Sequence, residues 1–411
     1  MRSLRVIILG LLVFGTGAAS ASYNPAFVVQ VSPAIYAALE PTLMLHPPRR
    51  PSGLDYLDAF RRRAEEVAGR DYMAGLAIAV IENGEPVFVF TSGEEAVGSG
   101  RPVTEHTLFR AASVSKGMTG TLMALLEHEG RLNLVDDVPR ELLPLPDGRA
   151  ATAEQVLAQR TGLVPHALDR QMEAGIDLYD LRNRFRSQRT VCRPGQCYSY
   201  QNVTFTSLET LGAQAAGLPF ELAMRAWLFE RIGMNDATIG VDDLITADSW
   251  ARPHRRRDRV AGQLVAGDPQ SAYDTTVSAA GVNVSLRDMI AYARAHLGAS
   301  QRLPRAVLDR VHASAGDTPE QTRRLYRLSE RIDSTGYGLG WRTYDWNGHQ
   351  LLTHSGYLSG YGAQIYLEPA TGFAYVGLWN ADGDAPWWLF PTLMDLRTGD
   401  GPGDWLDQID Q

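Results

Sequence analysis

Lysine is almost absent from this sequence of 411 residues. Among its 39 lysine and arginine residues only Lys116 is a lysine, and it lies in the segment SVSK at 113–116. The net charge is −8, and the one strongly basic run is RPHRRRDR at 252–259. This balance argues against nucleic acid as a partner of the whole chain. We interpret the arginine-rich run as a solvated loop, with a local binding surface as the alternative.

Cysteine is also scarce, because the chain has only Cys192 and Cys197, within CRPGQC. Two cysteines make a poor metal site, and the nine histidines show no zinc-type spacing beside them, so no metal or other cofactor is expected. In an oxidising compartment such a pair usually closes. Pro194-Gly195 is a turn pair that would bring the two sulfurs together. The sequence therefore predicts a Cys192–Cys197 disulfide.

The N-terminus lacks an apolar run long enough to span a bilayer comfortably. Its apolar run, Val6–Phe14, follows Arg2 and Arg5 and precedes Ala19-Ser20-Ala21, which fits an A-x-A cleavage site. The pattern predicts a signal peptide over 1–21 and a periplasmic or secreted protein that has no stable membrane span once the signal is removed. An uncleaved anchor is the alternative. Residues 22–53 are interpreted as an irregular lead-in.

Strand signals lie at both ends of the chain and helix signals lie between them. Runs at 77–81 and 86–90 flank Asn83-Gly84, which predicts a hairpin, and strand patterns return from 337 onward. The segment from about 117 to 310 is rich in helical periodicity. A helix is also predicted over 54–70, with one apolar face made by Leu54, Leu57, Phe60, Ala64 and Val67.

These patterns predict an α+β fold. Its N- and C-terminal strands would form one antiparallel sheet flanked by helices, with an inserted all-helical region at about 117–310. The expected domain covers 54–392, and 393–411 is interpreted as a C-terminal tail.

Lys116 follows Ser113 by three residues, at the start of a predicted helix that ends near Gly130. Residues three apart lie on one helical face, so the two side chains would be neighbours. The helix N-terminus and burial both lower the pKa of an amine. A neutral Lys116 could accept the Ser113 proton, which an arginine could not, because its guanidinium stays charged. The alternative is that a single lysine remained there by chance.

Two further segments join FRAASVSKGMTG in a recognisable order, namely PGQCYSYQN and LLTHSGYLSGYG. With them the sequence resembles the serine β-lactamase and penicillin-binding protein superfamily, in its class C β-lactamase and DD-peptidase branch. The resemblance runs from about 54 to 392. It extends to QRTGLVP at 159–165, SAAGVNVSLRDMIAYAR at 278–294, YGLGW at 337–341 and VGLWN at 376–380.

The resemblance implies roles for four residues of the first two motifs. Ser113 would be the acylated nucleophile and Lys116 its proton acceptor. Tyr200 would share the proton transfers, as an anion favoured by the field of Lys116. Asn202 would hydrogen-bond the amide side chain of the substrate. Outside these motifs, His166 is interpreted as a surface histidine, with a place in the cleft wall as the alternative.

The third motif would supply the substrate-binding residues His354, Gly356 and Tyr357. Gly356 would let the substrate backbone come close, and the N–H groups of Ser113 and Tyr357 would form an oxyanion hole. His354 stands where the commonest version of the motif has lysine, and Tyr357 is bulkier than the small residue often found there. Both departures argue against efficient β-lactam hydrolysis and leave acyl transfer possible.

The sequence thus predicts an exported serine hydrolase that acts on an amide or ester through a Ser113 acyl-enzyme, like a β-lactamase or D-alanyl-D-alanine carboxypeptidase. Its substrate would be a D-amino-acid peptide, a β-lactam or an ester. A carboxylesterase on the same scaffold and a non-catalytic penicillin-binding sensor are the alternatives. A Ser-His-Asp triad is poorly supported, since no G-x-S-x-G segment is present.

Overall fold

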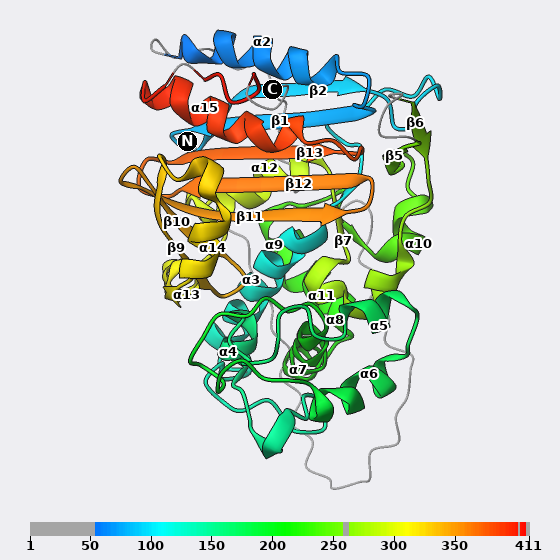
Figure 1. The fold of residues 1–411 in the computed structure, drawn as a ribbon, viewed down its shortest axis with the longest axis vertical. Helices are drawn as coiled ribbons and strands as arrows, with labels where there is room; N and C mark the ends of the chain where they lie inside the picture. The colour runs from blue at the N-terminus through cyan, green and yellow to red at the C-terminus, as the bar shows by residue number, and fades with distance from the viewer. Residues whose placement is uncertain (1–53, 258–262, 402, 408–411) are drawn as a thin grey trace, which may run out of the picture. The chain divides into compact units, whose positions relative to one another are not determined.

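An antiparallel sheet organises the part of the chain that the computed structural model describes, residues 54–257, 263–401 and 403–407. The predicted signal peptide and lead-in lie outside the described residues. Eight strands form the sheet in the order β2-β1-β13-β12-β11-β10-β9-β8 (Figure 1). N-terminal strands therefore pair with C-terminal ones, as the sequence predicts. The strands are β1 (Gly75–Glu82), β2 (Glu85–Gly93), β8 (Ser314–Asp317), β9 (Ile332–Gly338), β10 (Arg342–Trp346), β11 (His349–Leu358), β12 (Tyr361–Glu368) and β13 (Phe373–Trp379).

Short strands interrupt the middle region, which the sequence predicts to be all helical. Strands β3 (Phe109–Arg110), β7 (Val282–Val284) and β4 (Thr238–Ile239) form a small sheet, and β5 (His254–Arg256) pairs with β6 (Leu264–Ala266). Segments of two or three residues carry no periodicity, so the sequence pattern misses them.

Helices make up the rest of the described regular structure. The first predicted helix, 54–70, is observed as α2 (Tyr56–Ala68), which buries Leu57, Phe60, Ala64 and Val67. The others are α3 (Ser115–His128), α4 (Ala153–Leu157), α5 (Asp169–Glu173), α6 (Leu178–Arg184), α7 (Thr206–Ala216), α8 (Phe220–Met224), α9 (Glu230–Ile232), α10 (Gly240–Ile245), α11 (Val277–Ala280), α12 (Leu286–His296), α13 (Arg305–His312), α14 (Pro319–Arg324) and α15 (Leu389–Thr398).

The two faces of the sheet belong to different apolar cores. Alternate residues of β1 divide between them, because side chains of a strand point to opposite faces in turn. Ile78 and Val80 pack with apolar residues of α2 and α15, whereas Ala77 and Ala79 pack with those of α3 and α12. Figure 1 shows α2 and α15 over one face of the sheet. The segment with Ser113 and Lys116 lies on the side of α3.

Helix α15 crosses the boundary at 392 that the sequence analysis places before a C-terminal tail. Its residues Leu389, Phe390, Leu393 and Met394 are fully buried, and their helical spacing is a signal that could have extended the domain. Trp405 and Leu406 are buried as well. The described part of 393–411 therefore contributes Leu393, Met394, Trp405 and Leu406 to the packed core.

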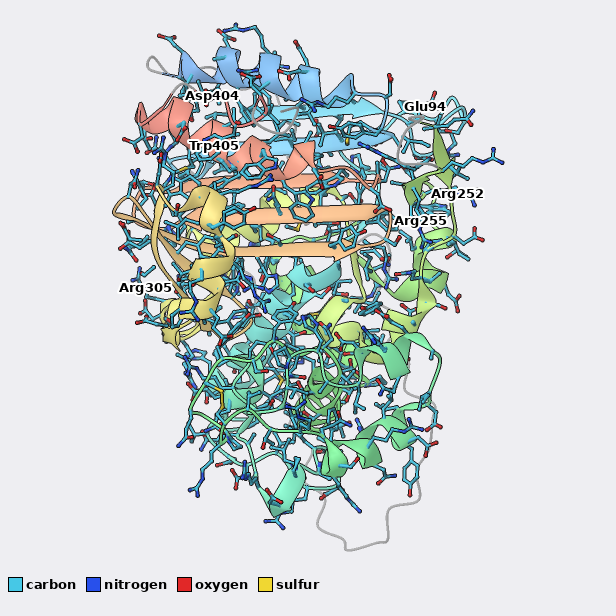
Figure 2. All side chains as sticks on the ribbon, viewed as in Figure 1. Glu94, Arg252, Arg255, Arg305, Asp404 and Trp405 are labelled. Atoms are coloured by element: carbon cyan, nitrogen blue, oxygen red, sulfur yellow. A yellow bond between two sulfur atoms is a disulfide. The ribbon has the colours of Figure 1, made fainter. Side chains whose placement is uncertain are left out.

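The arginine-rich run falls partly within the described residues. Arg252 forms an ion pair with Asp268 at 2.8 Å, and β5 follows it (Figure 2). His254 is fully buried, while Arg255 and Arg256 are exposed. The run thus forms one strand of the β5–β6 hairpin in its described part.

None of the helices in the described residues has the length and apolar character that crossing a membrane requires.

Candidate active site

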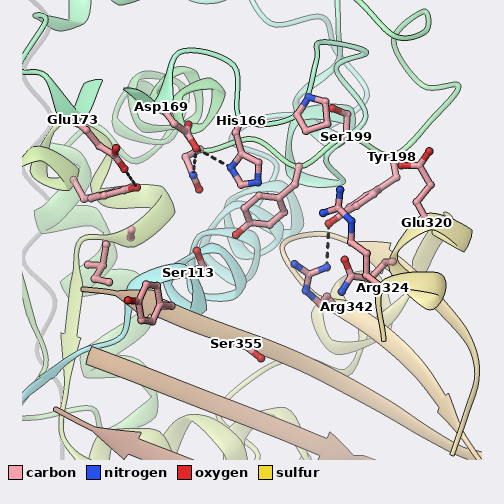
Figure 3. A pocket seen from close by; sticks show the side chains of 18 residues that line it. Ser113, His166, Asp169, Glu173, Tyr198, Ser199, Glu320, Arg324, Arg342 and Ser355 are labelled. Carbon is pink, nitrogen blue, oxygen red and sulfur yellow. Dashed lines mark hydrogen bonds and ion pairs between the residues drawn. The ribbon is translucent and has the colours of Figure 1, made fainter. Parts of the chain in front are cut away.

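A pocket of about 380 Å³ opens beside Ser113. Figure 3 shows Ser113 at its base, with His166 and Asp169 on one wall and Arg342 with Tyr198 on another. The lining comes from segments far apart in sequence and includes Tyr200, Asn202, Ser355 and Tyr357. The pocket thus brings together four of the predicted site residues, namely Ser113, Tyr200, Asn202 and Tyr357. Lys116 is buried next to the pocket and forms a hydrogen bond with Ser113.

Ser113 lies in a tight 3-10 turn, Ala112–Val114, that leads directly into α3. Ala112 has a φ of +47°, a left-handed conformation that non-glycine residues seldom adopt. Lys116 follows in the first turn of α3. Gly340, from the YGLGW segment, packs against that turn, since a Cβ there would collide with the Lys116 carbonyl oxygen. The motif segments therefore fix the backbone of the Ser113–Lys116 pair.

The Lys116 amine is fully buried and has three hydrogen-bond partners. Nζ lies 3.1 Å from Ser113 Oγ, 2.7 Å from Asn202 Oδ1 and 3.0 Å from the carbonyl oxygen of Ala279. Burial lowers the pKa of Lys116 to about 7, the charge of Asp169 opposes this, and Arg342 adds to it. At neutral pH the amine can therefore exist uncharged beside the Ser113 hydroxyl.

Tyr200 lies over Lys116, whose Nζ is 4.8 Å from the centre of the Tyr200 ring. Burial raises the pKa of Tyr200 to about 12, while Arg342 and a side-chain hydrogen bond with Ser113 partly oppose the rise. The phenol is thus neutral in the resting site, whereas the sequence analysis expects the field of Lys116 to favour the anion. The cation that lowers the pKa of Tyr200 here is Arg342.

Each end of the Asn202 amide makes a hydrogen bond within the protein. Oδ1 accepts from Lys116, and Nδ2 donates to Asp169 Oδ2 at 2.7 Å. His166 shares the same carboxylate oxygen through Nδ1 at 2.8 Å. The His166 side chain is 54% exposed and lines the pocket. Asp169, which links the two, is absent from the predicted site, because no motif marks it in the sequence.

His354 is fully buried and does not reach the pocket wall. Its Nδ1 donates to the Ser355 carbonyl at 2.9 Å, so its Nε2 accepts from Tyr337 at 3.0 Å. Burial, with help from Arg342 and Lys116, lowers the pKa of His354 well below its usual value. The ring is a neutral part of the scaffold with both nitrogens hydrogen-bonded, and the contact with substrate that the resemblance implies stays a prediction.

Gly356 brings β11 against the turn that carries Ser113. A Cβ at this position would collide with the Ala111 carbonyl oxygen. Gly356 is therefore needed for strand–turn packing, and the role in the approach of substrate that the resemblance implies stays a prediction. Tyr357, one residue on, is 58% exposed, lines the pocket and donates to Asp382 Oδ1 at 3.0 Å. The oxyanion hole of Ser113 and Tyr357 stays a prediction.

Two arginines that the sequence analysis does not single out line the pocket, Arg342 at the start of β10 and Arg324 at the end of α14. Arg342 donates to the Tyr198 hydroxyl at 3.0 Å and lies 5.3 Å from the centre of the Tyr200 ring. No ion pair joins either arginine to a carboxylate among the described residues. Both guanidinium groups thus line the pocket without a carboxylate partner in the described part of the chain.

The Cys192–Cys197 disulfide predicted from the sequence is present. It lies just before Tyr198 and Tyr200, and the Val191 N–H next to it donates to the Gly162 carbonyl at 2.8 Å. Buried Gln201 extends this bracing, since its Nε2 donates to the Val164 carbonyl at 2.7 Å. The segment that carries Tyr200 is thus held to the 159–165 segment.

Comparisons with known proteins identify the family of the chain. The family model described as Beta-lactamase matches residues 60–387. The chain belongs to the Beta-lactamase family. It is 25% identical to a β-lactamase of Yersinia enterocolitica over 298 residues, which cover 72% of this chain and 70% of the relative. It is also 25% identical to penicillin-binding protein 4 of Amycolatopsis lactamdurans, covering 78% and 84% of the two chains.

A solved structure supports the Beta-lactamase family fold independently. The octameric penicillin-binding protein homologue of Pyrococcus abyssi has a TM-score of 0.72 and 20% sequence identity to this chain. The match covers 84% of this chain and 77% of that one. At this identity the likeness concerns the fold, and the chemistry must be argued from the residues of the pocket.

Proposed function

We propose that the protein is an exported serine hydrolase that cleaves an amide or ester through an acyl-enzyme on Ser113. The observation that carries the proposal is the 3.1 Å contact between Ser113 Oγ and the buried amine of Lys116. An adjacent neutral base is what makes a serine hydroxyl nucleophilic. A non-catalytic binding protein would gain nothing from an amine held in this state.

Acylation would begin when Ser113 Oγ bonds to the carbonyl carbon of the substrate while its proton moves to Lys116 Nζ. The carbonyl electron pair moves to oxygen, where backbone N–H groups of Ser113 and Tyr357 would stabilise it. Collapse of this intermediate breaks the bond to the leaving group, which takes the proton from Lys116. Tyr200, whose ring centre lies 4.8 Å from Lys116 Nζ, would pass that proton on.

Deacylation would use a water that attacks the Ser113 ester. The water gives up one proton to the Lys116–Tyr200 pair, which returns one proton to the departing Ser113 oxygen. The sum is the addition of one water to the acyl group, and the resting site is restored.

The substrate would bring a carboxylate to Arg342. This guanidinium and that of Arg324 line the pocket without an acidic partner among the described residues, and arginine binds carboxylates in a bidentate fashion. A peptide with a free C-terminal carboxylate or a β-lactam carries such a group. A neutral ester does not, so the pocket favours the peptidase or β-lactamase reaction over the carboxylesterase alternative.

The test is to incubate the purified protein and a Ser113→Ala variant with a fluorescent penicillin and with p-nitrophenyl butyrate. Mass spectrometry should find one acyl group on the peptide containing Ser113, and the variant should acquire none. Ester turnover without penicillin labelling would favour the carboxylesterase, and lasting label without turnover would favour the sensor. Turnover that survives in Ser113→Ala would exclude the proposed nucleophile.

A further inference from the structure

We propose that Asp169 is a positioning residue for the reaction, because its carboxylate sets which way the Asn202 amide faces and thereby aims the lone pair of Lys116 at Ser113. The inference rests on the proposed acyl-enzyme function and adds to it a residue that touches neither Ser113 nor Lys116. It also assigns to Asn202 a task inside the protein, since each end of its amide hydrogen-bonds a protein side chain.

The first step is the placement of Asp169. It is 8% exposed and begins α5, directly after a loop in which His166 and Leu168 both have left-handed backbone conformations, with φ of +57° and +70°. Such conformations cost energy in residues other than glycine and concentrate at functional sites. Here they bring Asp169 Oδ2 to 2.7 Å from Asn202 Nδ2 and 2.8 Å from His166 Nδ1.

The second step is the orientation of the amide. An ionised carboxylate can only accept hydrogen bonds, so the end of Asn202 that faces Asp169 must be its NH2 group. The amide oxygen must then face Lys116, 2.7 Å away. The two amide orientations have nearly the same shape, and the Asp169 carboxylate favours the one in which the amide oxygen faces Lys116.

The third step is the direction of the lone pair. Asn202 Oδ1 and the Ala279 carbonyl oxygen are both acceptors, so each takes one N–H from Lys116. A neutral amine has two N–H groups and one lone pair. With both N–H groups engaged, the lone pair is left for the remaining neighbour, Ser113 Oγ at 3.1 Å. If the amide were reversed, its NH2 group would donate to this lone pair instead.

The experiment measures the rate of Ser113 acylation by the fluorescent penicillin for the parent protein and Asp169→Asn. The asparagine keeps the shape of Asp169 but can donate, so either orientation of Asn202 becomes possible. We expect acylation to fall about 10- to 100-fold through misdirection of the base. The loss should persist at about pH 9, where the amine is neutral in both proteins, which separates misdirection from a change in the charge of Lys116.

Glu173→Gln is the matched control. It removes one negative charge from the same pocket wall, where Glu173 accepts from Tyr273 and has no contact with Asn202. The variant should keep the pH dependence of the parent. Because each variant removes one negative charge from the pocket wall, an effect of charge alone on the acylation rate would appear in both. Charged and titratable groups that face Lys116 come from several elements. Those groups are Asp169 on α5, Tyr200, Arg342 on β10 and His354 on β11.

Thermal unfolding shows whether each variant is folded, and Asp169→Ser supplies the comparison if Asp169→Asn is not. Acylation of a folded Asp169 variant at the parent rate at about pH 9 would overturn this inference and leave the Ser113 acyl-enzyme standing. A parent protein that neither probe acylates would overturn the proposed function, and this inference with it.

Discussion

At the scale of single residues, Lys116 is where the proposed chemistry depends on pH. Burial lowers the pKa of Lys116 to about 7, so its amine is protonated and inactive below that pH and neutral above it. Acylation of Ser113 should therefore rise about tenfold per pH unit below neutrality and level off above it. Labelling rates measured across this range test the prediction, and a flat profile would contradict it.

Lys116→Arg provides the complementary prediction at the same position. A guanidinium stays charged throughout the accessible pH range, so this variant should lose at least about 100-fold in acylation rate at every pH. Raising the pH should not rescue it. Recovery of the parent rate at alkaline pH would show that another group accepts the Ser113 proton.

The residues of the site were predictable from the sequence to different degrees. Ser113, Lys116, Tyr200 and Asn202 are marked by short motifs, and the structure brings them together. Asp169, Arg324 and Arg342 are not marked by any motif, because their contacts join segments that lie far apart in the chain. His354 shows the opposite case: its motif position is recognisable in the sequence, but only the packing against Tyr337 reveals that the ring is buried.

At the scale of secondary structure elements, the approach of β11 to the turn carrying Ser113 is the critical contact. Gly356→Ala would place a methyl group against the Ala111 carbonyl oxygen, and the strand would have to move away. We expect a loss of about 1–3 kcal/mol in stability from the overpacking. Acylation should fall about 10- to 100-fold, because the displaced turn misplaces the nucleophile.

Gly267→Ala is the control for Gly356→Ala. The nearest atom to an added Cβ there is the Pro253 carbonyl oxygen, 3.7 Å away, and the backbone is not left-handed. Thermal unfolding and Ser113 labelling should both resemble those of the parent. Equal effects of the two substitutions would show that loss of glycine, rather than the β11 contact, is responsible.

At the scale of the whole molecule, the antiparallel sheet and the covering helix α2 were predictable, whereas the covering helix α15 was not. The signals at 77–81 and 86–90 correspond to β1 and β2, and pairing with C-terminal strands followed from their positions in the chain. The segment 393–411, predicted to be a tail, contains the second half of α15. The signal in the sequence is the apolar spacing that continues through Leu393 and Met394. The middle region, predicted to be all helical, contains β7. This strand of three residues pairs with β3 on one side and β4 on the other.

The separation of the two cores by the sheet gives the last prediction. Phe390 on α15 is fully buried on the face away from α3, where it packs against Trp346 and Tyr366. Phe390→Ala should cost about 3–5 kcal/mol of stability through lost burial and the cavity left behind. The Ser113 site depends on the other core, so acylation by folded protein should keep the parent rate. Leu122→Ala, which removes buried volume from α3 itself, should lower both the unfolding temperature and the acylation rate. An equal loss of acylation in both variants would mean that the sheet transmits packing changes between its faces.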